Sequence, residues 1–475
     1  MPNLTIHHLP DELLLEIFDL YRQDIDPYDL QWRKKHVWID LTHVCRKWRS
    51  VMFASYSRLD LGITVGPAKP GYIKTILSGT LPISIDYKDM YGDITGSILW
   101  RMRAALNHHE RVREIAFEGT IANFDKILKM TQRAFPVLES LSLRFTIKLY
   151  KAKLPDTFLR GPDLSVLHLR HLRLEHVSLE SISGFLLSAT AVTDLILQID
   201  VTAFSPSPEL PEDSLLTCLR GMPCLRYLDL FIEIGSPLQP STTPKDIVRL
   251  SKLTVIIYYA NGVFFDNLVA GLSAPSLRDV DICFDDIPPN VYLPRFINEI
   301  EEQYHAVHVA FETWDFSFSL QTQSEYNNHC KPRFKLGPVL GGVPELIRMC
   351  GALSTRLTTM EVLHITFVWM VPIGNVWEND MPWREFFQHF PSVKAIRTEG
   401  ANSYRIARAL LQDHGDPNDG LAFLSTLEEI ELGKNPLLTD ESRSSCQCGH
   451  ELAAFEPFVS ARQQVGRPVK VFFSP

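Results

Sequence analysis

The sequence lacks the long apolar runs that would place it in a membrane. No run reaches the roughly 18 residues that a membrane-spanning helix needs, and residues 1–12 have neither the basic start nor the apolar centre of a secretory signal. Cysteine is scarce: the eight cysteines in 475 residues are scattered, unlike those of a disulfide-rich secreted domain. We therefore expect a protein of the reducing cytoplasm or nucleus, with no membrane partner.

An excess of positive charge is missing as well. The chain has 47 basic and 56 acidic residues, which gives a formal net charge of −9 at pH 7. Proteins that bind nucleic acid generally present a strongly basic surface, so this balance predicts no nucleic-acid partner. One short basic stretch, Trp32–His36, follows Asp24, Asp26 and Asp29, and we interpret it as a solvated loop.

The familiar catalytic and phosphate-binding motifs are absent from the sequence. It contains no G-x-S-x-G, no P-loop, no G-x-G-x-x-G and no H-E-x-x-H. Cys446, Cys448 and His450 offer three zinc ligands, but a fourth ligand and the spacing of a zinc finger are lacking, so a flexible loop is favoured. We expect no metal, no cofactor and no enzymatic activity. An enzyme stays open as an alternative if dispersed Asp, His or Cys side chains meet in a pocket.

A group of aspartates is the remaining candidate for chemistry. Asp279, Asp281, Asp285 and Asp286 stand around the end of an expected strand. Paired carboxylates serve acid–base chemistry or bind a cation. Alternate strand residues of a repeat protein face solvent, so we favour a solvated row of acids, with contact to a basic partner as the alternative.

The dominant pattern in the sequence is a repeat in which three apolar residues occupy the first, fourth and sixth positions of a six-residue unit. Eleven copies begin at Val112, Leu138, Leu164, Val192, Leu225, Leu253, Leu277, Ala306, Met360, Val393 and Leu427. The starts are 24 to 34 residues apart, apart from one step of 54. This pattern is typical of a leucine-rich-repeat solenoid, in which short strands form a parallel curved sheet with helices on the outer face.

The stretches around the repeats complete this α/β prediction. Further strands are expected at residues 59–65, 81–87 and 469–473, and helices at 98–106, 121–134, 179–189, 343–356, 383–390 and 451–464. The asparagine that usually ends each repeat is missing, so irregular repeats are expected. Residues 313–342 depart most from the pattern and predict an extra hairpin and loop, and residues 433–450 predict an irregular segment before a C-terminal cap.

Two apolar-faced helical segments precede the repeats. In Leu9–Tyr21, apolar residues recur at helical spacing after Pro10, which suits a first helical turn. In Trp38–Phe53, apolar residues including Val44 and Trp48 recur in the same way. We therefore divide the chain into a helical domain at 1–60 and a repeat domain at 61–475.

The pairing of LPDELLLEIF (9–18) with LTHVCRKWRSV (41–51) resembles the F-box, the helical module that docks onto the adaptor subunit of cullin–RING ubiquitin ligases. The whole chain is similar to the large group of F-box proteins with degenerate leucine-rich repeats in mushroom-forming fungi. The resemblance implies a substrate-recognition subunit, with the adaptor bound at one end, cullin and RING subunits beyond it, and a target protein on the repeats. It implies adaptor contacts by Leu9, Pro10, Leu13, Ile17, Leu41, Val44 and Trp48.

One departure from the F-box pattern supports a different function. The link between the helices, residues 21–37, is longer and more charged than is usual in an F-box. The alternative is therefore a scaffold that keeps an F-box-like start without entering a ligase. The sequence does not identify the target protein.

Overall fold

The computed structural model describes most of the helices and strands of the chain. The described residues are 9–23, 41, 44–55, 63–65, 81–88, 94–145, 154, 157–160, 168–177, 179–200, 211–233, 246–284, 292–311, 315–323, 334–340, 343–367, 383–399, 403–411, 424–433 and 445–473. The chain divides into two compact units, Met1–Val192 and Thr193–Pro475. The boundary expected near residue 60 is a change from helices to strands within the first unit.

The first unit combines a pair of helices with a parallel sheet. The helices of the pair are α1 (Asp11–Gln23) and α3 (Arg46–Ala54). The strands, in the order β1-β2-β3-β4-β5, are β1 (Ile63–Val65), β2 (Ile83–Lys88), β3 (Val112–Gly119), β4 (Ser140–Phe145) and β5 (His171–Val177), and each pair is parallel. Three further helices are α5 (Gly96–Leu106), α6 (Ile121–Leu128) and α7 (Leu179–Ser188).

Aromatic side chains fill the core between these strands and α6. Phe124 of α6 packs on Phe117 of β3, Phe145 of β4 and Phe158, with ring centroids 5.5, 5.4 and 5.8 Å apart. All four rings are buried. Burying aromatic area of this kind is the main force that holds a repeat against its neighbour.

The second unit is a longer run of the same alternation. Its strands are β6 (Asp194–Asp200), β7 (Tyr227–Glu233), β9 (Val255–Ala260), β11 (Asp279–Phe284), β12 (Ala306–Phe311), β13 (Asp315–Gln321), β14 (Phe334–Leu340), β15 (Val362–Phe367), β16 (Ala395–Glu399), β17 (Glu429–Leu432) and β18 (Lys470–Phe473). A separate short pair is β8 (Val248–Arg249) with β10 (Leu272–Ser273). The helices are α8 (Pro211–Arg220), α9 (Gly262–Ala270), α10 (Leu293–Asn298), α12 (Val343–Ala352), α13 (Ser354–Leu357), α14 (Trp383–Gln388), α15 (Ser403–Leu411) and α17 (Ser445–Gln464).

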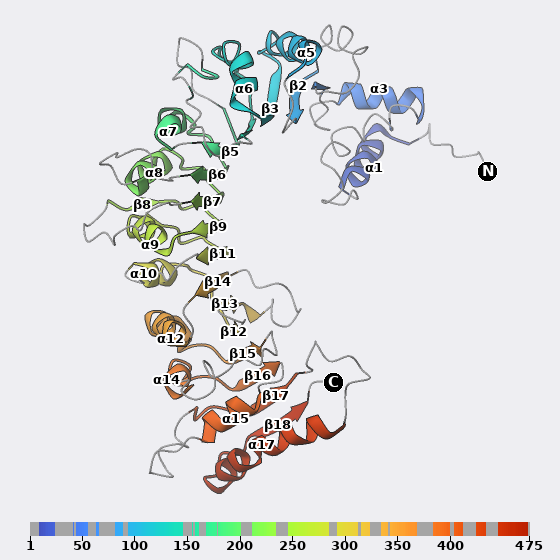
Figure 1. The fold of residues 1–475 in the computed structure, drawn as a ribbon. Helices are drawn as coiled ribbons and strands as arrows, with labels where there is room; N and C mark the ends of the chain where they lie inside the picture. Colours follow the sequence, from blue (N-terminus) through green and yellow to red (C-terminus); the bar gives the residue numbers. More distant parts are fainter. Residues whose placement is uncertain are drawn as a thin grey trace, which may run out of the picture. The chain divides into compact units, whose positions relative to one another are not determined.

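The strands of the second unit stand in the order β6-β7-β9-β11-β14-β13-β12-β15-β16-β17-β18, and all pairs are parallel except those made by β13. Helices α8, α9, α10, α12 and α14 lie along one side of these strands (Figure 1). The expectation of an α/β chain built on a mostly parallel sheet is therefore confirmed.

The three apolar positions of each copy explain why the strands stack. In the copy that forms β7, Leu225, Leu228 and Leu230 are all buried, and the residues between them are not. Backbone bonds join successive copies at the same point, for example from the Thr254 amide to the Arg226 carbonyl at 2.9 Å. Every second residue of a strand is buried, and backbone hydrogen bonds join the strand to the next one. Each strand therefore covers the edge of the strand before it.

The copy of the repeat expected at Leu164 begins outside the described residues, which omit 161–167. The strand that pairs with β4 is β5, which begins at His171. The buried apolar residues there are Leu169, Leu172 and Leu174, which also fit the repeat pattern. Two overlapping copies of the pattern compete in this stretch, and the later one is the one that pairs with β4.

Two segments depart from the repeat pattern. Residues 313–342, expected to form an extra hairpin and loop, supply the antiparallel pair β13 and β14, which lies within the sheet between β11 and β12. Phe316, Phe318 and Leu320 of β13 are buried, so the alternating FSFSL run has an inward face that requires cover. The second segment is the start of α17, where residues 445–450 are helical, not an irregular loop. None of the helices in the described residues combines the length and apolar character that a membrane span requires.

Candidate functional site

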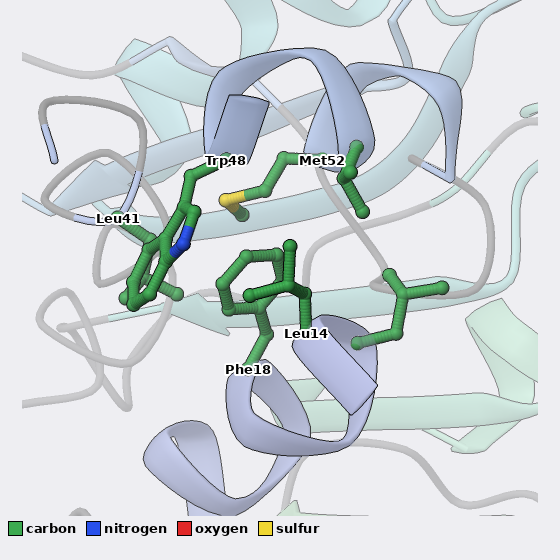
Figure 2. Packing of buried hydrophobic residues seen from close by; sticks show 7 residues of the cluster. Leu14, Phe18, Leu41, Trp48 and Met52 are labelled. Carbon is green, nitrogen blue, oxygen red and sulfur yellow. The ribbon is translucent and has the colours of Figure 1, made fainter. Parts of the chain in front are cut away.

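The two N-terminal helices pack on each other through a small apolar core. Leu14 and Phe18 of α1 point towards Trp48 and Met52 of α3, and Leu41 lies beside Trp48 (Figure 2). The Phe18 and Trp48 rings meet edge to face, with centroids 4.9 Å apart. An edge-to-face aromatic pair adds about 1 kcal/mol to the burial of the rings themselves. This core fixes the outward faces of both helices.

Polar contacts hold the beginnings of the two helices together. Lys47 of α3 donates a hydrogen bond to the Leu9 carbonyl at 2.5 Å and lies 3.5 Å from the Asp11 carboxylate. Asp11 and Glu12 place negative charge at the positive end of the α1 dipole. The Cys45 sulfur accepts from the Trp48 amide at 3.5 Å and caps α3.

A second apolar face of α1 stays exposed. Leu13, Ile17, Leu20 and Tyr21 are between 39% and 64% exposed, and they recur at the spacing i, i+4, i+7 and i+8. They therefore form one stripe along the helix, beside the buried face made by Leu14, Leu15 and Phe18. We call these four residues the exposed apolar stripe. A contiguous apolar surface of this kind marks an interaction site more often than a chance surface feature.

The seven residues that the F-box resemblance assigns to adaptor contact fall into two groups. Pro10, Leu13, Ile17 and Val44 are exposed, with Val44 at 53%, and Leu9 is half-buried against the core. Leu41 and Trp48 are 6% and 8% exposed, so they belong to the core between the helices. These two side chains support the outer surface from the core, and the exposed residues are the ones accessible from solvent.

The expected adaptor contacts leave out three exposed apolar residues of the two helices. These are Leu20 and Tyr21 of α1 and Phe53 of α3. At 100° per residue, positions 13, 17, 20 and 21 fall within one 100° sector. A helical projection of the α1 sequence therefore shows that these four apolar residues share one face. Residues 21–23 of the expected link form the end of α1, and the rest of the link, with its basic stretch at 32–36, lies outside the described residues.

The other sequence candidates are scattered through the second unit. Asp281 is exposed and Asp279 half-buried on β11, and residues 285 and 286 lie outside the described residues. Cys446, Cys448 and His450 belong to the first turns of α17 in place of the expected loop. In the part of the chain that the structure describes, no group of three or more His, Cys, Asp or Glu side chains is arranged to hold a metal ion.

A polar cluster on β12, β15 and β16 is the nearest approach to a catalytic arrangement. The His308 and His364 rings stack with centroids 4.4 Å apart, and His308 Nε2 lies 2.9 Å from the Thr366 hydroxyl. His364 Nε2 lies 3.3 Å from the Glu399 carboxylate. Burial, with a smaller contribution from His364, lowers the pKa of His308 to about 4, against the opposing effect of Glu399. Hydrogen bonding to His364 is the main cause that lowers the pKa of Glu399.

The polar side chains of this cluster bond to one another. His308 is neutral at pH 7 because its pKa is far below 7, and Glu399 is ionised. The Thr366 hydroxyl lies within 3.4 Å of both His364 and Glu399. Such mutual bonding is the arrangement of a polar network across three strands.

No family model matches the chain, and the search of curated proteins finds no similar sequence. The F-box and leucine-rich-repeat interpretations therefore rest on the quoted motifs and on the geometry above.

Proposed function

We propose that the chain is the substrate-recognition subunit of a cullin–RING ubiquitin ligase. The paired N-terminal helices dock onto the adaptor subunit, and the leucine-rich-repeat-like strands bind a target protein. The observation that supports this most directly is the exposed apolar stripe on α1, set beside an intact core between α1 and α3. Helix α1 has buried one apolar face against α3 and presents a second apolar face to solvent. An exposed apolar face of this kind is the surface on which a partner protein packs.

The proposed role involves no covalent chemistry by this chain. Holding a target beside the charged conjugating enzyme of the assembly raises the effective concentration of the target lysine, which is a contribution of proximity. The second unit supplies a long row of strand faces on which a target fits. The competing function is an F-box-like scaffold outside any ligase.

Co-purification of the full-length chain with adaptor and cullin tests the proposal. The variant L13D/I17D places two charges on the exposed stripe, where the side chains are not part of the core, and we expect it to abolish co-purification. The matched control is V137D/L187D, which charges two apolar residues that are equally exposed elsewhere in the first unit. Charging Trp48 is less informative, because Trp48 is buried and its loss disrupts the helical pair itself.

The outcomes separate the two functions. Recovery of adaptor and cullin with the unmodified chain and with V137D/L187D, but not with L13D/I17D, supports the ligase subunit. A folded chain that recovers neither protein favours the scaffold. Equal recovery with L13D/I17D would show that the stripe is not the docking surface.

A further inference from the structure

The open face of four neighbouring strands in the second unit has an unusual composition. Apart from Asp200 and Glu233, whose side chains lie outside the described ones, the residues of β6, β7, β9 and β11 that alternate with the buried apolar residues are half-buried or exposed. We call this set the acidic aromatic face: Asp194, Ile196, Gln198, Tyr227, Asp229, Phe231, Val255, Ile257, Tyr259, Asp279, Asp281 and Cys283. It holds four carboxylates, three aromatic rings and no basic residue.

The strand register arranges these side chains in three rows. One row runs Asp194, Tyr227, Val255, Asp279, so its two ends are acidic. The middle row runs Ile196, Asp229, Ile257, Asp281, and the third runs Gln198, Phe231, Tyr259, Cys283. With strands about 4.8 Å apart and residues two apart separated by about 6.8 Å, the face measures roughly 14 Å in each direction. An extended segment of four or five residues covers that distance.

Tyr259 is the central anchor of this face. It is 46% exposed, and its ring stacks on Phe231 with centroids 4.9 Å apart and planes within 1° of parallel. Phe231 covers one side of the ring. On the other side, the register partner of Tyr259 is Cys283, a small residue, and Asp281 stands two residues before it on the same strand. A cation above that side of the ring meets both the aromatic surface and a carboxylate.

The middle row repeats the same chemistry. Asp229 and Asp281 are the register partners of Ile257 from opposite sides, so their Cα atoms stand about 9.6 Å apart, or two strand spacings. The aliphatic side chain between them suits the apolar stem of a long basic side chain, whose charged end reaches a carboxylate. Two of the four carboxylates have hydroxyl neighbours: Thr193 donates to Asp194 at 2.6 Å, and the Tyr227 hydroxyl lies 3.4 Å from Asp229.

We propose that the acidic aromatic face binds a basic, extended segment of the target protein, with an arginine or lysine lying over Tyr259 beside Asp281. Charge complementarity identifies the occupant, because the face has four negative groups against one cation in register beside it, Lys335 on β14, which stands opposite Asp281. Aromatic rings with adjacent carboxylates favour arginine and lysine over neutral side chains. This binding site adds the chemistry of the target to the proposed function. It rests on that function only for what happens to the target after it is bound.

Fluorescence anisotropy with a labelled nonapeptide of alternating arginine and alanine tests the proposal on the full-length chain. We expect D229N/D281N to weaken binding about tenfold or more and Y259A about threefold to fivefold. The matched control D125N/E428Q removes the same amount of charge from exposed positions elsewhere, and we expect it to change the affinity by less than about twofold. A labelled peptide of alternating glutamate and alanine should not bind.

Failure to bind the arginine peptide would overturn the proposal. An equal loss of affinity in D229N/D281N and D125N/E428Q would also overturn it, because it would indicate general attraction by net charge. Adaptor binding is measured on the same samples. If the chain binds the peptide but not the adaptor, the acidic aromatic face is supported and the ligase proposal is contradicted. If it binds the adaptor but not the peptide, the ligase proposal is supported and the acidic aromatic face is contradicted.

Discussion

Trp48 shows how one residue supports a surface that it does not form. Its ring packs on Phe18 and is buried, and its indole N–H is enclosed without a hydrogen-bond partner. An enclosed donor of this kind costs free energy, so the large ring must stabilise the pair through packing alone. The residue is therefore more important to the position of α1 against α3 than to any direct contact with a partner.

Replacing Trp48 with alanine should destabilise the helical pair by about 3–5 kcal/mol, the usual cost of removing a buried large aromatic side chain. Hydrogen exchange of the amides in α1 and α3 measures this directly. Trp48→Phe should cost much less, because it keeps an aromatic ring and removes the unpaired donor. If Trp48→Ala left the exchange of both helices unchanged, the packing shown in Figure 2 would be wrong.

His308 couples stability to pH through its burial. Its pKa is about 4 in the folded chain and 6.5 in the ordinary exposed state, so the unfolded chain binds the extra proton between these values. Stability is therefore complete above pH 6.5 and falls as the pH drops towards 4, by up to about 3 kcal/mol from this group. Glu399, whose pKa is lowered, loses its contribution as the pH falls below its ordinary value of 4.5.

Urea unfolding at intervals between pH 7.5 and 4.5 tests this coupling. The unmodified chain should lose stability steadily below pH 6.5, and His308→Gln should remove most of that slope because glutamine does not titrate. His109→Gln is the control, since that imidazole belongs to the first unit, where it is bonded to the Ala134 carbonyl. Parallel pH profiles for the chain and His308→Gln would exclude His308 as the source.

At the level of elements, the sequence predicts that a strand is present more readily than it predicts the register of that strand or its role. The pattern of Leu225, Leu228 and Leu230 places β7 correctly. Around Leu164 and Leu169 two overlapping patterns are equally apolar, and pairing with β4 decides between them. On α1, apolar residues cover more than half of the helix, and only packing on α3 separates the buried face from the exposed stripe. Such choices depend on neighbours distant in sequence.

One arginine joins two elements that the repeat pattern does not connect. Arg356 of α13 donates to the carbonyls of Ile297 and Asn298 at 3.2 and 2.9 Å, and also to those of Ile300 and Glu302 at the end of α10. The last carbonyls of a helix have no partner within the helix. The guanidinium fork bonds to several carbonyls at once, and it has five N–H donors in a fixed plane where a lysine has three.

Arg356→Ala should therefore destabilise the second unit by about 2–4 kcal/mol, since it leaves several carbonyls unpaired. Arg356→Lys should recover less than half of that loss. Chemical denaturation measures both, with Arg408→Ala on the exposed side of α15 as the control. Equal stability of Arg356→Ala and Arg408→Ala would refute the capping role.

At the scale of the whole molecule, stacked strands create an edge at each end that needs cover. At the C-terminal end, β18 pairs with β17, and Phe455 and Phe458 of α17 are buried. Arg462 of the same helix is also buried and donates to the Leu427 carbonyl at 3.0 Å. An uncovered parallel edge invites pairing with another chain. Strand β18 covers the edge of β17 and is itself the last strand in the order, so α17 and β18 form a cap over β17.

Phe455→Ala should loosen this cap at a cost of about 3–5 kcal/mol and expose β17 and β18 to hydrogen exchange and self-association. Phe472→Ala removes the same group from a position that is 38% exposed, and it should have little effect. Exchange rates and light scattering of the two variants decide the matter. A soluble Phe455→Ala variant with unchanged exchange would show that the cap is not needed.

The central claim is that the exposed apolar stripe on α1 docks the adaptor of a ubiquitin ligase. Its most direct test is a calorimetric titration of the purified full-length chain with purified adaptor. We predict submicromolar binding, a loss of about a hundredfold or more in L13D/I17D, as expected when two charges enter a desolvated contact, and an unchanged affinity in V137D/L187D. No heat of binding for the folded chain, or the same affinity for L13D/I17D as for the unmodified chain, would contradict the claim.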